Sequence, residues 1–436
     1  MTSLSPLTPP VNDKSIENQI YAKVTWRIIP FLCLCYLCAY LDRVNVGFAK
    51  LQMLNDLQWS ETVYGLGAGI FFVGYILVEV PSNILLQRVG AKRWIARIMI
   101  TWSLLSAATA FVTTPAMFYV IRFLLGVAEA GFLPGIILYL TYWYPASRRA
   151  KITAFFYCAI PLSGVIGGPL SGWIISALTG VSGLHGWQWL FILEAAPSLL
   201  VGIAVLFFLD DGIRKARWLT SSEKEILEKN IQSEAGDKHL HSIAQAFKDP
   251  RVWLMGLIFF TCGMGIYTFS FWLPTLIKEA GVKDVLNVGL LVAIPYTFGM
   301  VSMVLWARHS DKTRERRWHL SIAMGVGAIG LSLSTLTGYG IYFVLPALTL
   351  ASIGIQAMAP IFWSMPTAFL GGAAAAAGIA LITAVANIGG FISTYLVGWI
   401  KDLTHSADIG LYVVATVLVA GSIITLAAVP ARLVNK

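Results

Sequence analysis

Six ionisable side chains stand inside long apolar stretches of the sequence, where they could carry chemistry. They are Asp42, Arg43, Glu79, Arg122, Glu129 and Glu194. Charged groups at depth in hydrocarbon are costly and rare, and they usually face a cavity or a partner. Carboxyl groups can take up and release protons, and guanidinium groups bind carboxylates through paired hydrogen bonds. These residue types therefore point to the handling of protons and small organic anions.

The spacing of four of these residues predicts their depths. Asp42 and Arg43 stand about six residues before the outer end of the first predicted helix, and Arg122 stands about six after the outer start of the fourth. Glu129 follows Arg122 by two helical turns on the same face, about 10 Å further in. We therefore expect Asp42, Arg43 and Arg122 to share an outer level, with Glu129 close to the middle of the bilayer.

Carboxyl groups are the expected proton carriers, because every histidine falls in a predicted loop or at a helix end. Burial favours the neutral form of a carboxyl group, whereas a neighbouring arginine favours the charged form. An incoming anion that takes the arginine away would make the acid bind a proton, which links the two movements. Asp42 and Glu129 suit this role. The histidines are His185, His239, His241, His309, His319 and His405.

Structural interpretations of the same residues stay open. Asp42 and Arg122 could form an ion pair that only holds two helices together. Arg43 has no equally near acid except Asp42 beside it, and adjacent helical residues point in different directions, so an anionic substrate is its expected counter-ion. Glu79 and Glu194 lie towards the ends of their helices, and structural roles are favoured for both.

The composition excludes a water-soluble domain. The chain has 436 residues, of which 57% are hydrophobic and only 12% are charged, whereas soluble domains carry about a quarter charged residues. Five cysteines all fall in apolar stretches, and the cluster at Cys33, Cys35 and Cys38 lacks the histidine or carboxylate ligands of a metal site. No metal or prosthetic group is therefore expected.

Twelve apolar stretches have the length of a membrane-spanning helix, which is about 20 residues. They predict an all-α membrane protein with twelve transmembrane helices in two six-helix bundles. The predicted helices are 26–48, 62–86, 94–112, 116–143, 151–178, 187–209, 252–277, 286–307, 318–336, 341–366, 374–400 and 409–431.

Polar segments divide the chain into four parts. Residues 1–25 are expected to form a cytoplasmic tail, 26–209 the N-terminal bundle, 210–250 a cytoplasmic linker, and 251–436 the C-terminal bundle with a short cytoplasmic tail. A basic loop ending in Trp94 after the second helix is repeated as a basic loop ending in Trp318 after the eighth. Parallel halves of this kind are typical of transporters that bind substrate between two bundles.

Basic residues predict the orientation, because short loops rich in Lys and Arg stay in the cytoplasm. We expect both termini to be cytoplasmic and the cell inner membrane to be the location. The net charge of +9 is then a topology signal and no sign of nucleic-acid binding. The cytoplasmic set is Arg88, Lys92, Arg93, Arg97, Arg148, Arg149, Lys151, Arg308, Lys312, Arg314, Arg316 and Arg317, and the opposite loops carry Lys50, Lys278, Lys283 and Lys401.

Five segments together resemble the major facilitator superfamily and, within it, the anion:cation symporter family of organic-anion:proton symporters. The resemblance runs from the first helix to the twelfth. The segments are Tyr40-Leu-Asp-Arg-Val-Asn-Val-Gly47, Tyr75-Ile-Leu-Val-Glu-Val-Pro-Ser-Asn83, Arg122-Phe-Leu-Leu-Gly-Val-Ala-Glu-Ala-Gly131, Gly186-Trp-Gln-Trp-Leu-Phe-Ile-Leu-Glu194 and Asn387-Ile-Gly-Gly390.

The resemblance implies roles for individual residues. Asp42 and Glu129 would take part in protonation, and Arg43 would face the carboxylate of the substrate. Arg122 would pair with these acids and modulate them. In sugar-acid members, positions that line the site match Tyr75, Ser364 and Asn387.

The chain also departs from the family pattern. Asn83 and Gln87 replace the glycine and the acid of the superfamily's loop motif, which puts the charge lock of that loop in doubt. In the second half Asp311 keeps the acid, with Ala307 where glycine is expected. The segment 160–163 lacks the glutamine typical of galactonate-type members, so the motifs look closer to tartrate, phthalate and hydroxyphenylacetate permeases.

The sequence thus predicts a secondary transporter that imports a small organic carboxylate by proton symport with alternating access. The carboxylate would be a sugar acid, a dicarboxylate or an aromatic acid, and the transporter would act as a monomer in the lipid bilayer. The alternative is a transporter-like membrane sensor that signals through residues 210–250. An intramembrane enzyme is disfavoured, because no His-Glu-x-x-His or Gly-x-Ser-x-Gly motif is present.

Overall fold

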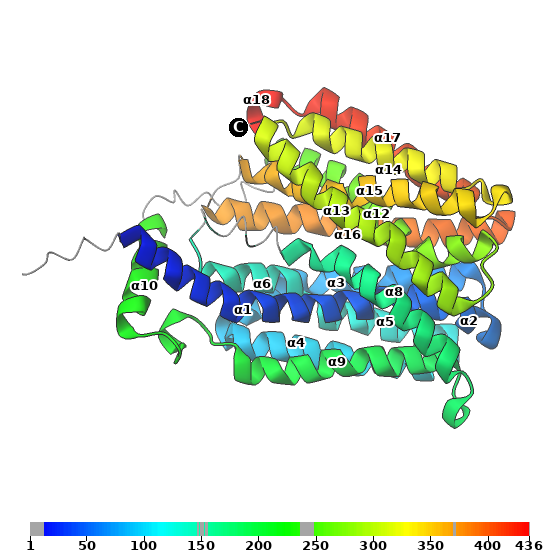
Figure 1. The fold of residues 1–436 in the computed structure, drawn as a ribbon, viewed down its shortest axis with the longest axis horizontal. Helices are drawn as coiled ribbons and strands as arrows, with labels where there is room; N and C mark the ends of the chain where they lie inside the picture. Colours follow the sequence, from blue (N-terminus) through cyan, green and yellow to red (C-terminus); the bar gives the residue numbers. More distant parts are fainter. Residues whose placement is uncertain are drawn as a thin grey trace, which may run out of the picture.

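The computed structural model describes residues 13–145, 148, 152, 156–235, 248–368 and 372–435. Parts of the predicted N-terminal tail, fifth helix and linker lie outside the described residues, as do Arg149 and Lys151 of the orientation argument. Within the described part, the chain forms two helical bundles that lie side by side, with helix α10 (Ser221–Ala235) at one end (Figure 1). We call this end of the bundles the linker end and the opposite end the far end.

The first bundle contains the helices before α10. Two of its predicted membrane helices are each divided in two, which gives α1 with α2 and α5 with α6. The helices are α1 (Asp13–Val44), α2 (Val46–Leu57), α3 (Glu61–Val89), α4 (Ala91–Ala108), α5 (Pro115–Glu129), α6 (Phe132–Thr141), α8 (Ala159–Leu178) and α9 (Gly186–Phe208).

The second bundle contains six long helices and a short C-terminal one. They are α12 (Pro250–Glu279), α13 (Val285–Thr313), α14 (Arg317–Ser334), α15 (Ile341–Ser364), α16 (Gly372–Thr404), α17 (Asp408–Ala428) and α18 (Ala431–Val434). Single turns of 3-10 helix lie between several of the long helices. They are η1 (Thr109–Phe111), η2 (Val181–Gly183), η3 (Ile213–Lys215), η4 (Thr337–Tyr339) and η5 (Pro366–Ala368).

Helix starts follow from local capping chemistry. The Thr114 hydroxyl accepts a hydrogen bond from the backbone N–H of Met117, and Pro115 occupies the first position of α5. Asp249 and Asp284 cap α12 and α13 in the same way. Such side chains satisfy backbone N–H groups that have no partner inside the helix.

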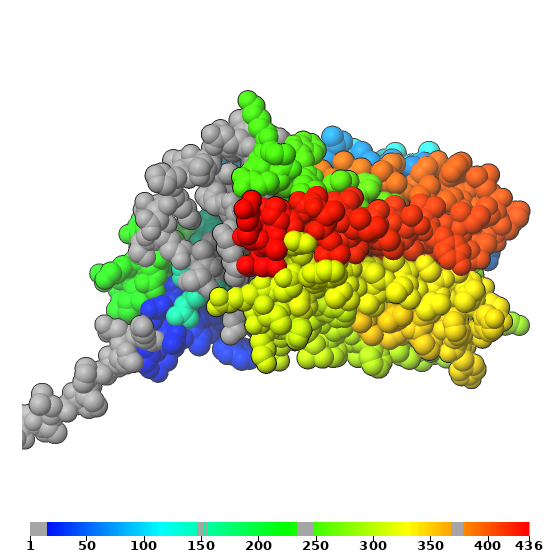
Figure 2. Space-filling model, turned by 90° about the horizontal axis from the view of Figure 1, so that it is seen from above, coloured from blue at the N-terminus to red at the C-terminus, as the bar shows by residue number. Residues whose placement is uncertain are grey.

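The prediction of an all-α membrane fold in two bundles is confirmed. Among the described residues, 11 helices are long and apolar enough to cross a membrane, counting α1 with α2 and α5 with α6 as single spans. Helix α14 lies at the place of the ninth predicted span, and the polar residues Arg317 and His319 stand at its start. Helix α17 runs along the outer surface of the second bundle (Figure 2), and exposes Ile409, Tyr412 and Ile423, as lipid-facing helices do.

The first helix differs from its predicted bounds. It begins at Asp13 and the span continues to Leu57, so it starts inside the predicted tail and extends beyond residue 48. Lys50, expected in an outer loop, is therefore buried within α2. The polar residues Lys50, Gln52 and Asn55 hid this extension, because a transmembrane prediction ends where apolar character fades.

The two bundles touch through helices that have glycine at the contact, where the absence of a side chain lets the backbones approach closely. A Cβ atom added to Gly65 on α3 would lie 2.6 Å from the carbonyl oxygen of Thr394 on α16. A Cβ atom on Gly168 of α8 would lie equally close, at 2.6 Å, to the carbonyl oxygen of Gly289 on α13. Backbones that approach this closely allow one bundle to pivot against the other without interlocking side chains.

Candidate functional site

A helix break and a helix junction position the central charges of the first bundle. Helix α5 ends at Glu129, and Gly131 follows with φ of 83°, a left-handed conformation that glycine adopts without strain. The junction between α1 and α2 falls at Asn45, two residues after Arg43, where the backbone stays helical with φ of −57° and ψ of −29°. Interrupted helices such as α5 with α6 are typical of the substrate sites of transporters.

Arg43, close to the junction, and Glu129, at the break, form a buried ion pair. The guanidinium carbon of Arg43 lies 5.1 Å from the ring centre of Tyr40, 5.4 Å from that of Phe71 and 5.6 Å from that of Tyr75. Aromatic faces attract a cation that has left water. Arg43, Glu129 and Tyr75, three of the predicted site residues, are thus brought together, whereas the sequence left Arg43 without a protein counter-ion.

Helices of the second bundle complete the surroundings of this pair. The hydroxyl of Tyr267 on α12 donates a hydrogen bond to Oδ1 of Asn387 on α16, with 3.1 Å between the oxygens. The Tyr267 ring packs against Phe72 of α3, with ring centres 4.4 Å apart. Asn387 therefore lies near the bundle interface, and its role in substrate binding stays a prediction. Tyr267 was missed, because a tyrosine in an apolar helix carries no signal of its own in the sequence.

Asp42 points away from Arg43 into a cage of neutral donors. Its carboxylate accepts hydrogen bonds from Nε1 of Trp102 at 3.0 Å and from Oγ of Ser106 at 2.8 Å, both on α4. Oγ of Ser198 on α9 donates a third. No arginine pairs with Asp42 within the described part of the chain. Asp42 and Glu129 are therefore two separate acids with different partners.

The predicted pairing of Arg122 with the acids is not what the structure shows. Arg122 is fully buried, and its Nε donates to the carbonyl oxygen of Gly67 at 3.3 Å. Its two terminal nitrogens have no hydrogen-bond partner among the described residues, and its guanidinium carbon lies 5.2 Å from the ring centre of Phe71. The open interpretation of an Asp42–Arg122 ion pair is therefore wrong for this conformation.

The predicted levels are also wrong. Because α1 and α2 run on to Leu57, Arg43 lies deeper than the sequence suggested and meets Glu129, whereas Arg122 lies nearer the far end. Two turns of helix separate Arg122 from Glu129, about 10 Å. Arg43 and Glu129 therefore share the inner level.

The remaining two acids are buried. Glu79 lies on α3 one turn after Tyr75, and Oε1 of its carboxyl group has no hydrogen-bond partner among the described residues. Glu194 on α9 accepts a hydrogen bond from Oγ of Ser171 at 2.6 Å. Each is only 2% exposed. The sequence placed them towards helix ends and did not show this burial.

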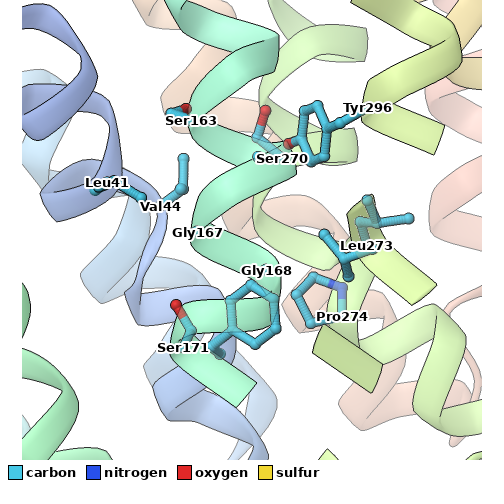
Figure 3. Close-up of a pocket in the computed structure, with 13 residues that line it drawn as sticks. Leu41, Val44, Ser163, Gly167, Gly168, Ser171, Ser270, Leu273, Pro274 and Tyr296 are labelled. Atoms are coloured by element: carbon cyan, nitrogen blue, oxygen red, sulfur yellow. The ribbon is translucent and has the colours of Figure 1, made fainter. Parts of the chain in front are cut away.

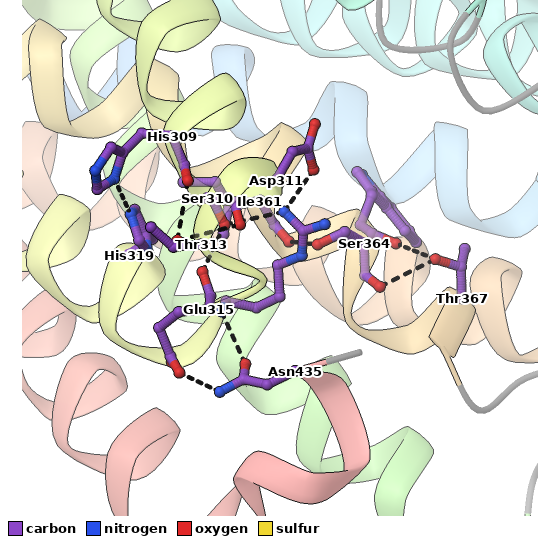
Figure 4. A network of polar contacts seen from close by, with 12 residues as sticks. His309, Ser310, Asp311, Thr313, Glu315, His319, Ile361, Ser364, Thr367 and Asn435 are labelled. Carbon is purple, nitrogen blue, oxygen red and sulfur yellow. Dashed lines mark hydrogen bonds and ion pairs between the residues drawn. The ribbon is translucent and has the colours of Figure 1, made fainter.

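Ser364 does not join the central group. It is the last residue of α15, and its hydroxyl donates to the carbonyl oxygen of Ile361 at 2.6 Å, beside a polar network at the linker end (Figure 4). In that network Arg316 pairs with Asp311 at 2.6 Å. Asp311, the acid expected of the second loop motif, is thus paired, and the site role of Ser364 stays a prediction.

The first loop motif lacks its acid, and a carboxylate of the linker lies beside this loop instead. Oδ1 of Asp211 accepts a hydrogen bond from the backbone N–H of Lys92 at the start of α4, with a length of 3.0 Å. Gly90, with φ of 97°, brings the chain next to this carboxylate. Asp211, which is distant in sequence, therefore caps the start of α4 beside the loop whose charge lock the sequence put in doubt.

At the far end, charged residues join the two bundles. Glu61 at the start of α3 pairs with Lys50 of α2 and with Lys401 of α16, both at 2.6 Å. Lys401 also pairs with Glu279 at the end of α12, at 2.5 Å. Asp402 accepts hydrogen bonds from the backbone N–H groups of Glu61 and Thr62. This far-end network holds the bundles together on one side of Arg43.

The arrangement allows a bound anion to replace the Glu129 carboxylate as the partner of Arg43. Arg43 has one acidic partner, and an anion that binds the guanidinium would leave Glu129 buried without its counter-ion. A buried carboxylate in that position binds a proton more readily. The described residues contain no group of three or more histidine, cysteine or acidic side chains that could hold a metal ion.

This chain resembles known proteins in sequence and in fold. A family model described as Major Facilitator Superfamily matches residues 32–394. The chain is 51% identical over 419 residues to a candidate metabolite transport protein, NicT, of Pseudomonas putida, which covers 96% of each chain. It is also 51% identical over 416 residues to a candidate tartrate transporter of Agrobacterium vitis, covering 95% of each.

A solved structure supports the fold at low sequence identity. The crystal structure of a D-xylose-proton symporter matches with a TM-score of 0.73 and 16% identity, over 93% of this chain and 98% of the other. At this identity the likeness concerns the fold alone.

Proposed function

Because the chain belongs to the Major Facilitator Superfamily, we propose that it imports a small organic carboxylate together with protons by alternating access. The observation that supports this proposal best is the buried Arg43–Glu129 pair, which lies in the first bundle beside the break that follows α5. The guanidinium provides a docking point for an anion, and the acid provides a proton site coupled to it.

Coupling follows from competition for one cation. When the carboxylate of the substrate binds Arg43, Glu129 loses its partner and takes up a proton, so that charge at the buried site stays balanced. Release of the substrate restores the pair and frees the proton. Tyr75, Tyr267 and Asn387 border this place and supply neutral groups that can hydrogen-bond the rest of the substrate.

The substrate class is narrowed by the relatives, two of which carry names of organic-acid or metabolite transport. We propose a hydroxylated or aromatic mono- or dicarboxylate, with L-tartrate as the first probe. No prosthetic group takes part in this scheme, and protons are the coupling ion. The transporter would act as a monomer.

The far-end network supports a direction of transport. With the bundles joined there, the structure corresponds to a state closed at the far end, and opening requires the Glu61–Lys401 pair to break. Basic loops at the linker end support a cytoplasmic position of that end under the positive-inside rule, and we propose the inner membrane of the cell as the location. Substrate would then enter from the far end and leave at the linker end.

Proteoliposomes containing the purified chain test the proposal. Labelled L-tartrate should accumulate when the outside is more acidic than the lumen, and an uncoupler should abolish the accumulation. Unlabelled phthalate and 4-hydroxyphenylacetate, added as competitors, would define the class. Uptake that is indifferent to the proton gradient for all three acids would refute proton symport.

A further inference from the structure

A second buried acid lies close to Asp42, on the far-end side. Glu194 and Ser198 are one turn apart on α9, so that their side chains are neighbours on one face of the helix. Ser198 donates to the carboxylate of Asp42, and both Asp42 and Asn45 lie within electrostatic reach of Glu194. A continuous line of polar groups thus joins the two acids inside a bundle that is otherwise apolar there.

The same line reaches a small cavity between the bundles. Ser171 of α8, whose hydroxyl donates to Glu194, lines this cavity together with Ser163 on the same helix (Figure 3). The opposite wall comes from α12 and α13, with Ser270 and Tyr296 (Figure 3). We call this space the interface cavity. Glu194 is therefore one hydroxyl group away from the space between the bundles, through Ser171, and one away from Asp42, through Ser198.

Glu194 is buried beside neutral hydrogen-bonding groups. The residue is only 2% exposed, and its neutral neighbours are Ser171 and Asn45. An ionised carboxylate would be very unfavourable in this setting, whereas a protonated one keeps an O–H that it can pass on.

We propose that Glu194 is a proton-relay residue that conducts protons from the interface cavity to Asp42, by a route separate from the Arg43–Glu129 pair. Protonated Glu194 gives its proton to Oγ of Ser198, while the original Ser198 proton moves to Asp42. In the next step Glu194 takes the proton of Ser171 at Oε1, and Ser171 receives one from water in the cavity. Both serines end neutral, and the net change is one proton moved from the cavity water to Asp42.

The charged groups around Glu194 fit this role. Of the described titratable residues, Asp42 on α1 is the one that acts on it, while α8 contributes the neutral Ser171 and the α1–α2 junction contributes the neutral Asn45. Helix α4 contributes Trp102 and Ser106, which hydrogen-bond Asp42 instead. No arginine or lysine is among the groups that act on Glu194, so its proton can leave without breaking an ion pair.

The relay rests on the proposed function and is tested with Glu194→Gln in proteoliposomes. The amide keeps an oxygen that accepts from Ser171, so packing is retained while proton transfer is lost. We expect gradient-driven accumulation of labelled L-tartrate to fall about tenfold or more, with exchange of internal for external L-tartrate changed less than about twofold. Exchange needs binding and bundle movement but no net proton flow.

A second pair of variants separates relay from folding. Ser171→Ala removes the link to the cavity and should lower accumulation about threefold to fivefold. Ser163→Ala is the matched control, because Ser163 lines the same cavity but its hydroxyl bonds only the carbonyl oxygen of Ile160. Ser163→Ala should accumulate L-tartrate like the unmodified chain.

Each outcome decides one question. Normal accumulation in Glu194→Gln, or an equal loss of accumulation and exchange, overturns the relay. If Glu194→Gln does not fold, equal accumulation in Ser171→Ala and Ser163→Ala overturns it instead. If the unmodified chain shows no proton-driven uptake, the proposed function fails first and the relay falls with it, whereas uptake that survives in every variant refutes the relay alone.

Discussion

The two bundles share one architecture but differ in where they keep buried charge. In the described part of the chain, every buried acidic or basic side chain belongs to the first bundle. These residues are Asp42, Arg43, Lys50, Glu79, Arg122, Glu129 and Glu194. The second bundle buries neutral polar groups instead, among them Thr268, Gln356 and Asn387. The charged groups of the proposed proton and anion chemistry thus all belong to one half.

This asymmetry has a mechanical consequence. An ion pair between the two bundles at the centre would have to break and form again in every transport cycle. Each break would leave buried charges without partners, which is costly. Keeping Arg43 and Glu129 on helices of one bundle lets the other bundle move past them with only hydrogen bonds to exchange. The Glu61–Lys401 ion pair between the bundles stands at the far end, where water can reach it when the bundles part.

The largest effect is expected from Arg43. Arg43→Ala should lower L-tartrate uptake about a hundredfold or more, because it removes the anion's docking point and leaves Glu129 without a counter-ion. Initial uptake rates in proteoliposomes measure this. Arg27→Ala, which removes an exposed arginine from the same helix, is the matched control. Comparable loss in both variants would show that Arg43 has no special role.

A smaller effect is expected on the neutral side of the interface. Asn387→Ala removes the acceptor for Tyr267 and should raise the KM for L-tartrate about tenfold with little change in kcat, since a neutral group contributes mainly to binding. The control is Thr383→Ala, one turn earlier on α16, where the hydroxyl bonds the carbonyl oxygen of Ile379. A loss as deep as that of Arg43→Ala would break the distinction between the bundles.

The far-end network should respond in the opposite direction. Lys401→Gln removes the ion pair with Glu61 that joins the bundles at the far end, along with the pair with Glu279 inside the second bundle, so the open state becomes more populated and external substrate binds more easily. The apparent KM for external L-tartrate should fall about threefold. Lys283→Gln, at an exposed lysine of the same end, should leave it unchanged. A KM that rises in Lys401→Gln would contradict the gating role.

The smallest effect is expected in the linker. Lys23 lies 2.9 Å from Glu223 and, with the backbone N–H of Thr220, holds the pKa of Glu223 below its ordinary value of 4.5. This stabilisation is present above the ordinary pKa and is lost as pH falls through the lowered one. Because the pair is solvent-exposed, Glu223→Gln should cost only about 0.5 kcal/mol at pH 7, measured as a small fall in Tm that vanishes in acid.

The sequence predicted the fold better than the site. Twelve apolar stretches and basic loops were enough for the helices and the two bundles, because apolar length is set by the bilayer itself. The partners of the charges could not be predicted, since the extension of the first helix through Lys50 shifted the depth of Arg43. Asp42 shows the same limit: its donors Trp102, Ser106 and Ser198 come from two other helices, and their approach depends on packing.

The central claim is that substrate binding at Arg43 makes protons move with the carboxylate. Proteoliposomes loaded with a pH-sensitive dye, with equal pH inside and outside, measure this directly. Adding L-tartrate outside should acidify the lumen in the unmodified chain and fail to do so in Glu129→Gln. A lumen that stays at constant pH while labelled L-tartrate enters, or that becomes alkaline, would contradict the account.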